Sequence, residues 1–275
     1  MNFDLPPTEQ TGPIRDLETL SIAELTAGMQ SSLAAVEQAV ATALPAANAL
    51  IEALVQRMKQ GGRLFYIGAG TSGRLGVIDA SECPPTFGID PGVVIGLMAG
   101  GDGALRTAVE GAEDDKEGAW SDLQAFQPNT MDTVIGIAAS GRTPYVIGGL
   151  LQARNAGLLT ACITCNPDTE VERVAEYALV AVTGPEFITG STRLNAGTAT
   201  KLLLNMITTV TMIQLGHVRG SQMVDMHPSN KKLVERGVRM IIEATGLDSD
   251  RASSLLSSTG SVRAAIDQAK EDARA

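Results

Sequence analysis

Short apolar runs alternate with helical patterns through the middle of the chain. The runs are rich in β-branched and aliphatic residues, which is typical of buried strands, and they lie at residues 64–67, 93–98, 133–138, 159–164 and 178–182. Helical patterns between and after them predict helices at residues 74–81, 104–126, 145–156, 170–175 and 196–215. This alternation predicts an α/β fold with a parallel sheet.

The two ends of the chain have other patterns. Residues 1 to about 17 contain tandem prolines and no period, which predicts an extended arm. A helical pattern then continues to Lys59, and we expect Pro45 to break it. After Gly220, helices are expected at residues 230–244, 248–257 and 260–274. We therefore expect an N-terminal arm and helix at 1–48, a central domain at 49–222 and a C-terminal helical segment at 223–275.

Composition and charge narrow the class of protein. Of the 275 residues 44% are hydrophobic and only 3% aromatic, so a sizeable core must be built from aliphatic side chains. The net charge of −10 argues against nucleic acid or an anionic membrane as a partner. The apolar runs are shorter than the roughly 18 residues that a membrane span requires, and the N-terminus has no signal-peptide pattern. We therefore expect a cytoplasmic protein without a membrane-spanning segment.

The cysteines and histidines give little indication of a metal or cofactor. Cys162 and Cys165 form a C-x-x-C pair, but a strand would point them to opposite faces. Two buried strand cysteines are therefore favoured over a redox or metal pair. Neither His217 nor His227 has a companion at metal-ligand spacing. We expect no cofactor and no metal.

Gly-rich loops follow two of the expected strands. Residues 67–74 (IGAGTSGR) resemble residues 135–142 (IGIAASGR), and each loop leads into an expected helix. Loops at the carboxyl ends of parallel strands line the ligand crevice, and helix starts offer N–H groups to anions. Residues 68–73 (GAGTSG) have the G-x-G-x-x-G spacing, which by itself is a weak signal for a dinucleotide, and neither loop has the G-x-x-x-x-G-K-[ST] pattern. A sugar phosphate is favoured, with simple tight turns as the alternative. A third polar cluster, residues 186–193, either contacts the ligand or caps the helix that follows.

Glutamates near these loops are candidates for acid–base chemistry. Glu82 is expected to end a helix beside Pro84 in an uncharged neighbourhood, where partial burial would raise its pKa and suit it to donate a proton. Glu110, Glu113 and Glu117 have the spacing of one helical face, and we expect the first two to be partly buried. Two glutamates with different pKa values could act as acid and base on a sugar. We expect Glu117, with Asp114 and Asp115, to lie on a solvated acidic face, which is also the alternative for Glu110 and Glu113.

Longer motifs lie at residues 68–76, 79–86, 108–114, 138–145, 189–193 and 196–199. Together they resemble the motifs of a known family, the bacterial N-acetylmuramic acid 6-phosphate etherases. The resemblance extends from Thr8 to about Leu233. Two positions depart from the usual pattern of the family: Asn195 stands where Lys is usual, and Gly12 where Asn is usual.

The resemblance implies a fold, a reaction and a biological setting. The fold is a sugar isomerase (SIS) domain, a parallel sheet with helices on both faces, in a homodimer. The enzyme is a carbon–oxygen lyase. It would cleave the D-lactyl ether of N-acetylmuramic acid 6-phosphate with water to give N-acetylglucosamine 6-phosphate and D-lactate, by elimination and hydration. The setting is amino sugar (N-acetylmuramate) catabolism in cell-wall recycling.

The resemblance also implies roles for individual residues. Glu82 would protonate the leaving lactate, and Glu113 would be the base that handles the proton or water. The residues expected to bind substrate, with Ser191 taken from the third polar cluster, are Thr71, Ser72, Glu110, Ser140, Gly141, Thr143 and Ser191. Two alternatives stay open on the same fold: a phosphosugar isomerase, and a non-catalytic phosphosugar sensor such as glucokinase regulatory protein.

Overall fold

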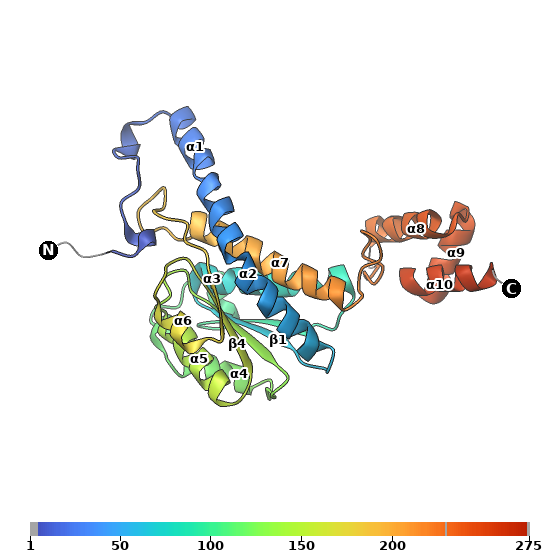
Figure 1. Cartoon of the computed structure of the whole chain (residues 1–275). Coiled ribbons are helices and arrows are strands. Elements are labelled where there is room, and N and C mark those ends of the chain that lie inside the picture. Colours follow the sequence, from blue (N-terminus) through green and yellow to red (C-terminus); the bar gives the residue numbers. More distant parts are fainter. Residues whose placement is uncertain (1–4, 229, 274–275) are drawn as a thin grey trace. The chain divides into compact units, whose positions relative to one another are not determined.

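The computed structural model describes residues 5–228 and 230–273 (Figure 1). The chain forms two compact units. The first comprises the chain up to Ala80 together with Gly92–Thr208, and the second comprises Ser81–Pro91 together with the chain from Thr209 onward. The expected domain boundaries after residues 48 and 222 stay predictions.

A five-stranded parallel sheet forms the centre of the first unit. Every residue of three strands is buried, as expected when helices cover both faces of a sheet. The strands lie within two residues of the expected bounds, so the predicted α/β class is confirmed. In spatial order they are β2 (Val94–Met98), β1 (Leu64–Gly68), β3 (Thr133–Ile137), β4 (Leu159–Thr164) and β5 (Tyr177–Val180).

The order of the strands reverses at β1, because β2 lies on one side of it and β3 on the other. Gly68 at the end of β1 is paired with Met98 of β2 and Ile137 of β3, so the carboxyl ends of the three strands are level. Such a reversal leaves a crevice at the carboxyl ends of the strands. The two Ser-Gly-Arg loops therefore flank the expected ligand crevice.

Helices cover both faces of this sheet (Figure 1). On one face, α4 (Gly118–Gln124), α5 (Pro144–Asn155) and α6 (Glu170–Val174) close a core that contains Phe65 and Leu150. Helices α5 and α6 confirm the helices expected at 145–156 and 170–175.

On the other face, α2 (Leu33–Met58) packs on β5. Helix α3 (Gly70–Phe87) packs on β1 at Gly76 and is hydrogen-bonded to α7 (Asn195–Gln214). The buried Asp79 of α3 accepts hydrogen bonds from Tyr66 of β1 (3.1 Å) and from Asn205 (2.9 Å) and Thr208 (3.3 Å) of α7. Burial raises the pKa of Asp79, and these hydrogen bonds oppose the rise. The carboxyl therefore joins a strand and two helices.

Two expected helix ends are wrong, and both involve proline. Helix α2 continues through Pro45, and the interruption lies instead between α1 (Ile22–Ser31) and α2. Helix α3 likewise continues through Pro84 and Pro85, so Glu82 lies inside a helix. An interior proline costs about 3 kcal/mol because it removes a hydrogen bond and crowds the preceding turn. In α2 burial on both sides of the proline, at Ala43 and Ala47 among others, outweighs that cost.

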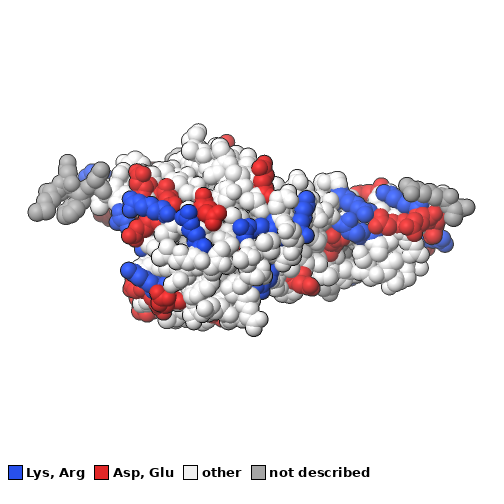
Figure 2. All heavy atoms as spheres, turned by 60° about the horizontal axis from the view of Figure 1, so that its bottom comes forward, with Lys and Arg blue, Asp and Glu red and all other residues white. Residues whose placement is uncertain are grey.

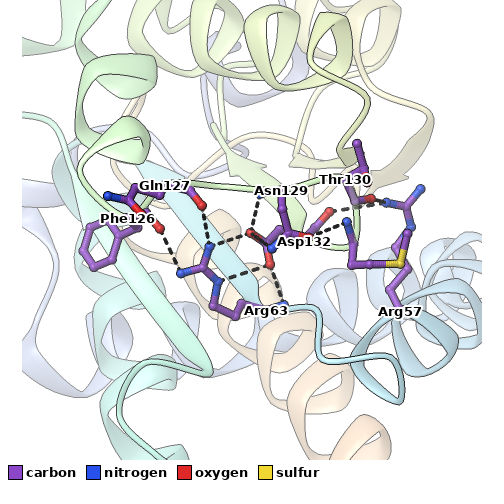
Figure 3. A network of polar contacts seen from close by, with 8 residues as sticks. Arg57, Arg63, Phe126, Gln127, Asn129, Thr130 and Asp132 are labelled. Carbon is purple, nitrogen blue, oxygen red and sulfur yellow. Dashed lines mark hydrogen bonds and ion pairs between the residues drawn. The ribbon is translucent and has the colours of Figure 1, made fainter.

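A buried carboxylate ties together the amino ends of β1 and β3 (Figure 3). Asp132, whose side chain is 0% exposed, pairs with the Arg63 guanidinium at 2.7 Å and accepts the backbone N–H groups of Arg63 (2.8 Å) and Asn129 (2.9 Å). Arg63 also donates to the carbonyls of Phe126 and Gln127. Burial alone would raise the pKa of Asp132, but these donors and the guanidinium charge together hold it below its ordinary value.

The second unit contains three further helices, which confirm those expected after Gly220. They pack around a core that includes Met240, Leu256 and Ile266. Their bounds are α8 (Lys231–Thr245), α9 (Ser249–Thr259) and α10 (Val262–Asp272).

One helical stretch in the described part of the chain is long and apolar enough to span a membrane by length and composition alone. It covers residues 22–58, and its most apolar window has a mean hydropathy of 1.3 and is 44% buried. The expectation that no stretch would meet this test is therefore wrong. The packing of α2 on β5 explains part of its apolar character, since core helices of soluble proteins meet the same test.

Candidate functional site

The loop after β1 is very short, because α3 begins at Gly70. Gly70 has a φ of +53°, and a Cβ at Gly68 would lie 2.8 Å from the backbone nitrogen of Gly73, so the turn requires glycine. Thr71 and Ser72 consequently occupy the first turn of α3, where both are half-buried. A helix start leaves backbone N–H groups unpaired, and these attract anions. This loop can therefore bind part of an anionic ligand.

The loop after β3 has a different conformation in spite of its similar sequence. Gly141 has a φ of +70°, and a Cβ there would lie 2.3 Å from the Cβ of Thr169. Helix α5 begins only at Pro144, so Ser140 precedes the helix whereas Ser72 lies within one. Thr143 is the N-cap residue of α5, but its side chain accepts no hydrogen bond from the helix. Its hydroxyl is therefore available to a ligand.

One residue of the third polar cluster has a structural role, which the sequence alone did not decide. Glu186 is fully buried, and its carboxylate accepts the backbone N–H groups of Asn195 (2.8 Å) and Ala196 (2.9 Å). This carboxylate therefore caps α7, whereas the capping alternative concerned the hydroxyl side chains of the cluster. Ser191, in the same loop, is half-buried. The start of α7 meets the start of α3, because a Cβ at Gly197 would lie 3.7 Å from the Thr71 methyl group.

The two departures from the family pattern contact this same loop. The Asn195 side chain is buried and accepts a hydrogen bond from the Ser32 hydroxyl (2.9 Å). A Cβ at Gly12 would lie 2.8 Å from the carbonyl oxygen of Glu186. In this chain the arm therefore lies directly against the loop before α7 at Gly12, and Ser32 contacts Asn195 at the start of α7.

Two of the cavities formed by the described residues lie at this edge of the sheet. The larger of these two has a volume of about 640 Å³ and includes the N-terminal arm. Thr8 fixes the arm, because its N–H donates to the Asn166 side chain (3.1 Å) and its hydroxyl accepts from the same amide (2.9 Å). Asn166 also donates to the carbonyl of Ala139 (3.0 Å). Sequence reasoning missed this contribution of the arm. The lining residues include Gln10, Ser140, Arg142, Thr169 and Arg173.

The smaller cavity, of about 180 Å³, brings Glu110 and Glu113 to the start of α3. The expected helix at 104–126 is wrong. Two short 3₁₀ turns, Asp102–Leu105 and Ala112–Asp114, precede α4, and Gly111 between them has a φ of +76°. Glycine favours such a conformation and weakens a helix, so Glu110, Glu113 and Glu117 share no helical face.

All three glutamates proposed for the site have exposed side chains. The partial burial expected of Glu82, Glu110 and Glu113 is therefore wrong. Glu110 and Glu113 line the smaller cavity of the first unit. Glu82 belongs to the second unit, in the part of α3 that follows Ala80.

The two C-x-x-C cysteines are buried, as predicted. Cys162 contributes to the core beneath α5, and the Cys165 thiol lies 3.7 Å from the carbonyl of Ala196 at the start of α7. Burial raises the pKa of each thiol to about 12. Both therefore stay protonated and poorly nucleophilic at neutral pH.

Similar proteins agree with the fold and the motifs. A family model of the glucokinase regulatory protein N-terminal SIS domain matches residues 47–154. Among solved structures, a phosphoheptose isomerase from Francisella tularensis superimposes with a TM-score of 0.54 at 18% identity, covering 70% of this chain and 100% of the other. A phosphoheptose isomerase from Neisseria gonorrhoeae gives 0.52 at 15% identity, covering 69% and 97%. These likenesses support the expected SIS-type sheet.

Closer relatives identify the family. An N-acetylmuramic acid 6-phosphate etherase of Christiangramia forsetii is 52% identical over 272 residues, which cover 99% of each chain. An etherase of the same name from Bacteroides fragilis is 53% identical over 96% of this chain and 94% of the other. With about half of its residues identical to those of two such enzymes over nearly its whole length, the chain belongs to the N-acetylmuramic acid 6-phosphate etherase family.

Proposed function

We propose that this enzyme removes D-lactate from N-acetylmuramic acid 6-phosphate by elimination and then adds water, with Glu113 as base and Glu82 as acid. One observation carries the proposal. Glu110 and Glu113 line the same cavity as the start of α3, at the edge of the sheet where strand order reverses. A cavity of this kind offers carboxylates and helix N–H groups to the same ligand.

The phosphate is proposed to bind at the loop after β3. Ser140 and Thr143 supply hydroxyls there, and the left-handed backbone of Gly141 turns the loop into the start of α5. Helix N–H groups and the positive end of the helix dipole favour a phosphate dianion. The loop after β1, with Thr71 and Ser72, lies on the neighbouring strand and is proposed to hold the sugar between the phosphate and Glu113, with Glu110 and Ser191 as further contacts.

The proposed chemistry needs one base and one acid. In the open-chain sugar the C2 hydrogen is acidic, because the C1 aldehyde accepts the electron pair that its removal leaves. Glu113 takes this proton, a double bond forms between C2 and C3, and the bond from C3 to the lactyl oxygen breaks as Glu82 protonates that oxygen. Water then adds its hydroxyl to C3 and a proton returns to C2, which gives N-acetylglucosamine 6-phosphate.

We further propose that the enzyme is a cytoplasmic homodimer that binds neither nucleic acid nor membrane and acts in cell-wall recycling. Helix α1 and the start of α2 leave apolar side chains uncovered, with Ile22 82% and Leu33 48% exposed, and a second copy of the chain could bury them. On the face seen in Figure 2, basic and acidic side chains are interspersed, without the basic patch that nucleic acid requires. Analytical ultracentrifugation would test the dimer.

A lactate assay tests the proposed function. The protein is incubated with N-acetylmuramic acid 6-phosphate, and D-lactate is followed with a coupled D-lactate dehydrogenase. Release of D-lactate in step with N-acetylglucosamine 6-phosphate supports an etherase. Conversion of the sugar without lactate would indicate a phosphosugar isomerase, and binding without turnover would indicate a sensor. Either result contradicts the proposal.

Replacement of Thr143 by valine is expected to raise KM about 10- to 150-fold and to change kcat little, because a hydrogen bond to a charged ligand stabilises by about 1.5–3 kcal/mol. Valine keeps the shape of the side chain and removes only the hydroxyl, which makes no capping hydrogen bond in the structure. Steady-state kinetics of lactate release measure both constants. Thr130→Val, at an exposed threonine before β3, is the matched control. An unchanged KM would show that this hydroxyl does not bind the phosphate.

A further inference from the structure

Arg74 of α3 donates hydrogen bonds to backbone carbonyls of a segment that is distant in the sequence. It lies in the second turn of α3 and is half-buried on the wall of the smaller cavity, together with Glu110 and Glu113. Its guanidinium donates from Nε to the carbonyl of Leu105 (2.9 Å) and from Nη2 to the carbonyl of Ala104 (2.7 Å). The arginine fork thus connects α3 to a segment about thirty residues further along the chain.

The segment that Arg74 contacts carries both glutamates of the cavity. The other hydrogen bonds described for residues 102–113 are local, between residues three or four positions apart, and the two helical turns of this segment are 3₁₀ turns. Such turns have poor hydrogen-bond geometry and occur in short pieces. The two hydrogen bonds from Arg74 therefore hold this segment from outside it.

Apolar contacts hold other points of the same segment. Ala104 is 1% exposed, Val109 packs against Gly100, and Ala112 packs on the core beneath α5. None of these apolar contacts fixes the direction of the backbone carbonyls of Ala104 and Leu105, at the end of the 3₁₀ turn Asp102–Leu105. Two hydrogen bonds from one planar guanidinium do fix it, because the fork has a rigid geometry.

We infer that Arg74 is a positioning residue for Glu113: by clamping the carbonyls of Ala104 and Leu105, it fixes the segment that presents this carboxylate to the cavity. The inference rests on the proposed function, in which Glu113 is the base. Arg74 itself need not touch the substrate, since two of its donors are already used by carbonyls. In the second Ser-Gly-Arg loop, by contrast, the exposed Arg142 lines the larger cavity.

Kinetics of three variants test this role. Arg74→Ala is expected to lower kcat about 10- to 100-fold and to leave KM within about twofold, because a displacement of about 1 Å at a catalytic group costs rate whereas the phosphate anchor is untouched. Arg74→Lys is expected to recover part of the loss, since an ammonium can donate to these carbonyls without the planar fork. Arg57→Ala is the matched control, because Arg57 donates to the carbonyls of Thr130 and Asp132 before β3, and it is expected to keep the unaltered kcat.

Exchange of the C2 hydrogen of the sugar with deuterium from the solvent, followed by NMR, shows whether Arg74 acts through Glu113. Arg74→Ala is expected to slow this exchange together with lactate release. In the Glu113→Gln background, Arg74→Ala is expected to cause no further loss, because residues that act as one unit are not additive. If Arg74→Ala unfolds the protein, as judged by its thermal transition, the same comparison is made with Arg74→Lys.

The outcomes separate the inference from the function on which it rests. An unchanged kcat in Arg74→Ala, with Glu113→Gln inactive, overturns the positioning role and leaves the proposed function intact. A raised KM with unchanged kcat overturns it in favour of substrate binding by Arg74. A fully active Glu113→Gln removes the proposed base and the inference with it. Loss of kcat and of exchange in both single variants, with no added loss in the double variant, supports the positioning role of Arg74 and the proposed function together.

Discussion

Glu113→Gln and Glu82→Gln are each expected to lower the rate of D-lactate release by about 10²- to 10⁴-fold, the range that a general acid or base contributes. Glutamine keeps the size of the side chain but can neither accept the C2 proton nor protonate the lactyl oxygen. Both side chains are exposed, so neither change is expected to disturb folding. The coupled lactate assay measures the rates, and gel filtration checks that the oligomeric state is unaltered.

The two variants are expected to fail at different steps. Glu113→Gln should lose the exchange of the C2 hydrogen with deuterium, because that exchange needs the base. Glu82→Gln should retain exchange while releasing no lactate, because the acid acts only as the ether bond breaks. Glu117→Gln, at an exposed glutamate four residues after Glu113, is the control and should behave like the unaltered enzyme. Full activity of Glu113→Gln or of Glu82→Gln would remove that residue from the mechanism.

Asp132→Ala is expected to lower the free energy of unfolding of the first unit by about 2–4 kcal/mol, because it leaves the Arg63 guanidinium and two backbone N–H groups without their buried acceptor. The chain has one tryptophan, Trp120 in α4, which packs against the core of the same unit. Its fluorescence during urea denaturation reports the stability of that unit. Asp90→Asn, at an exposed carboxylate, is the control and should shift the midpoint little.

The effect of Asp132 is expected to depend on pH. Its pKa in the folded protein lies below the ordinary value of about 3.9 for the unfolded chain. The stabilisation is therefore complete above about pH 5 and is lost as the pH falls through the lower pKa of the folded state. The difference in stability between the unaltered protein and Asp132→Ala should thus be largest near neutral pH and shrink below about pH 4. A difference that does not change with pH would contradict the proposed ionic contribution.

The sheet could be predicted from the sequence because each strand is a short apolar run bounded by glycine or polar residues. The wrong helix predictions show which information a single sequence does not contain. By local rules Pro45 and Pro84 mark helix breaks, but the burial that overrides those rules depends on residues far away in the chain. The segment at 104–126 has helical spacing, yet Gly111 takes a left-handed conformation that spacing cannot show.

The site was predictable in its motifs and not in its geometry. Two Ser-Gly-Arg motifs suggested two similar loops, but Ser72 lies inside a helix and Ser140 outside one. The hydrogen bonds from Arg74 to Ala104 and Leu105 go to backbone carbonyls, which any residue type supplies, so no pattern in the sequence marks them. The glutamates were expected to be partly buried because their neighbours are small and apolar, although such neighbours also occur on exposed turns.

The contact of Thr8 with Asn166 has a consequence for the order of events during synthesis. The two residues are separated by 158 positions, so Thr8 leaves the ribosome long before its partner exists. The strands β1 to β4 can pair as they emerge, since each follows its neighbour by a shorter interval, whereas the arm must wait until most of the sheet is complete. Contacts between residues so distant in sequence form late and slowly. The wall that the arm gives to the larger cavity is therefore expected to assemble on a newborn chain only after strands β1 to β4 have been made.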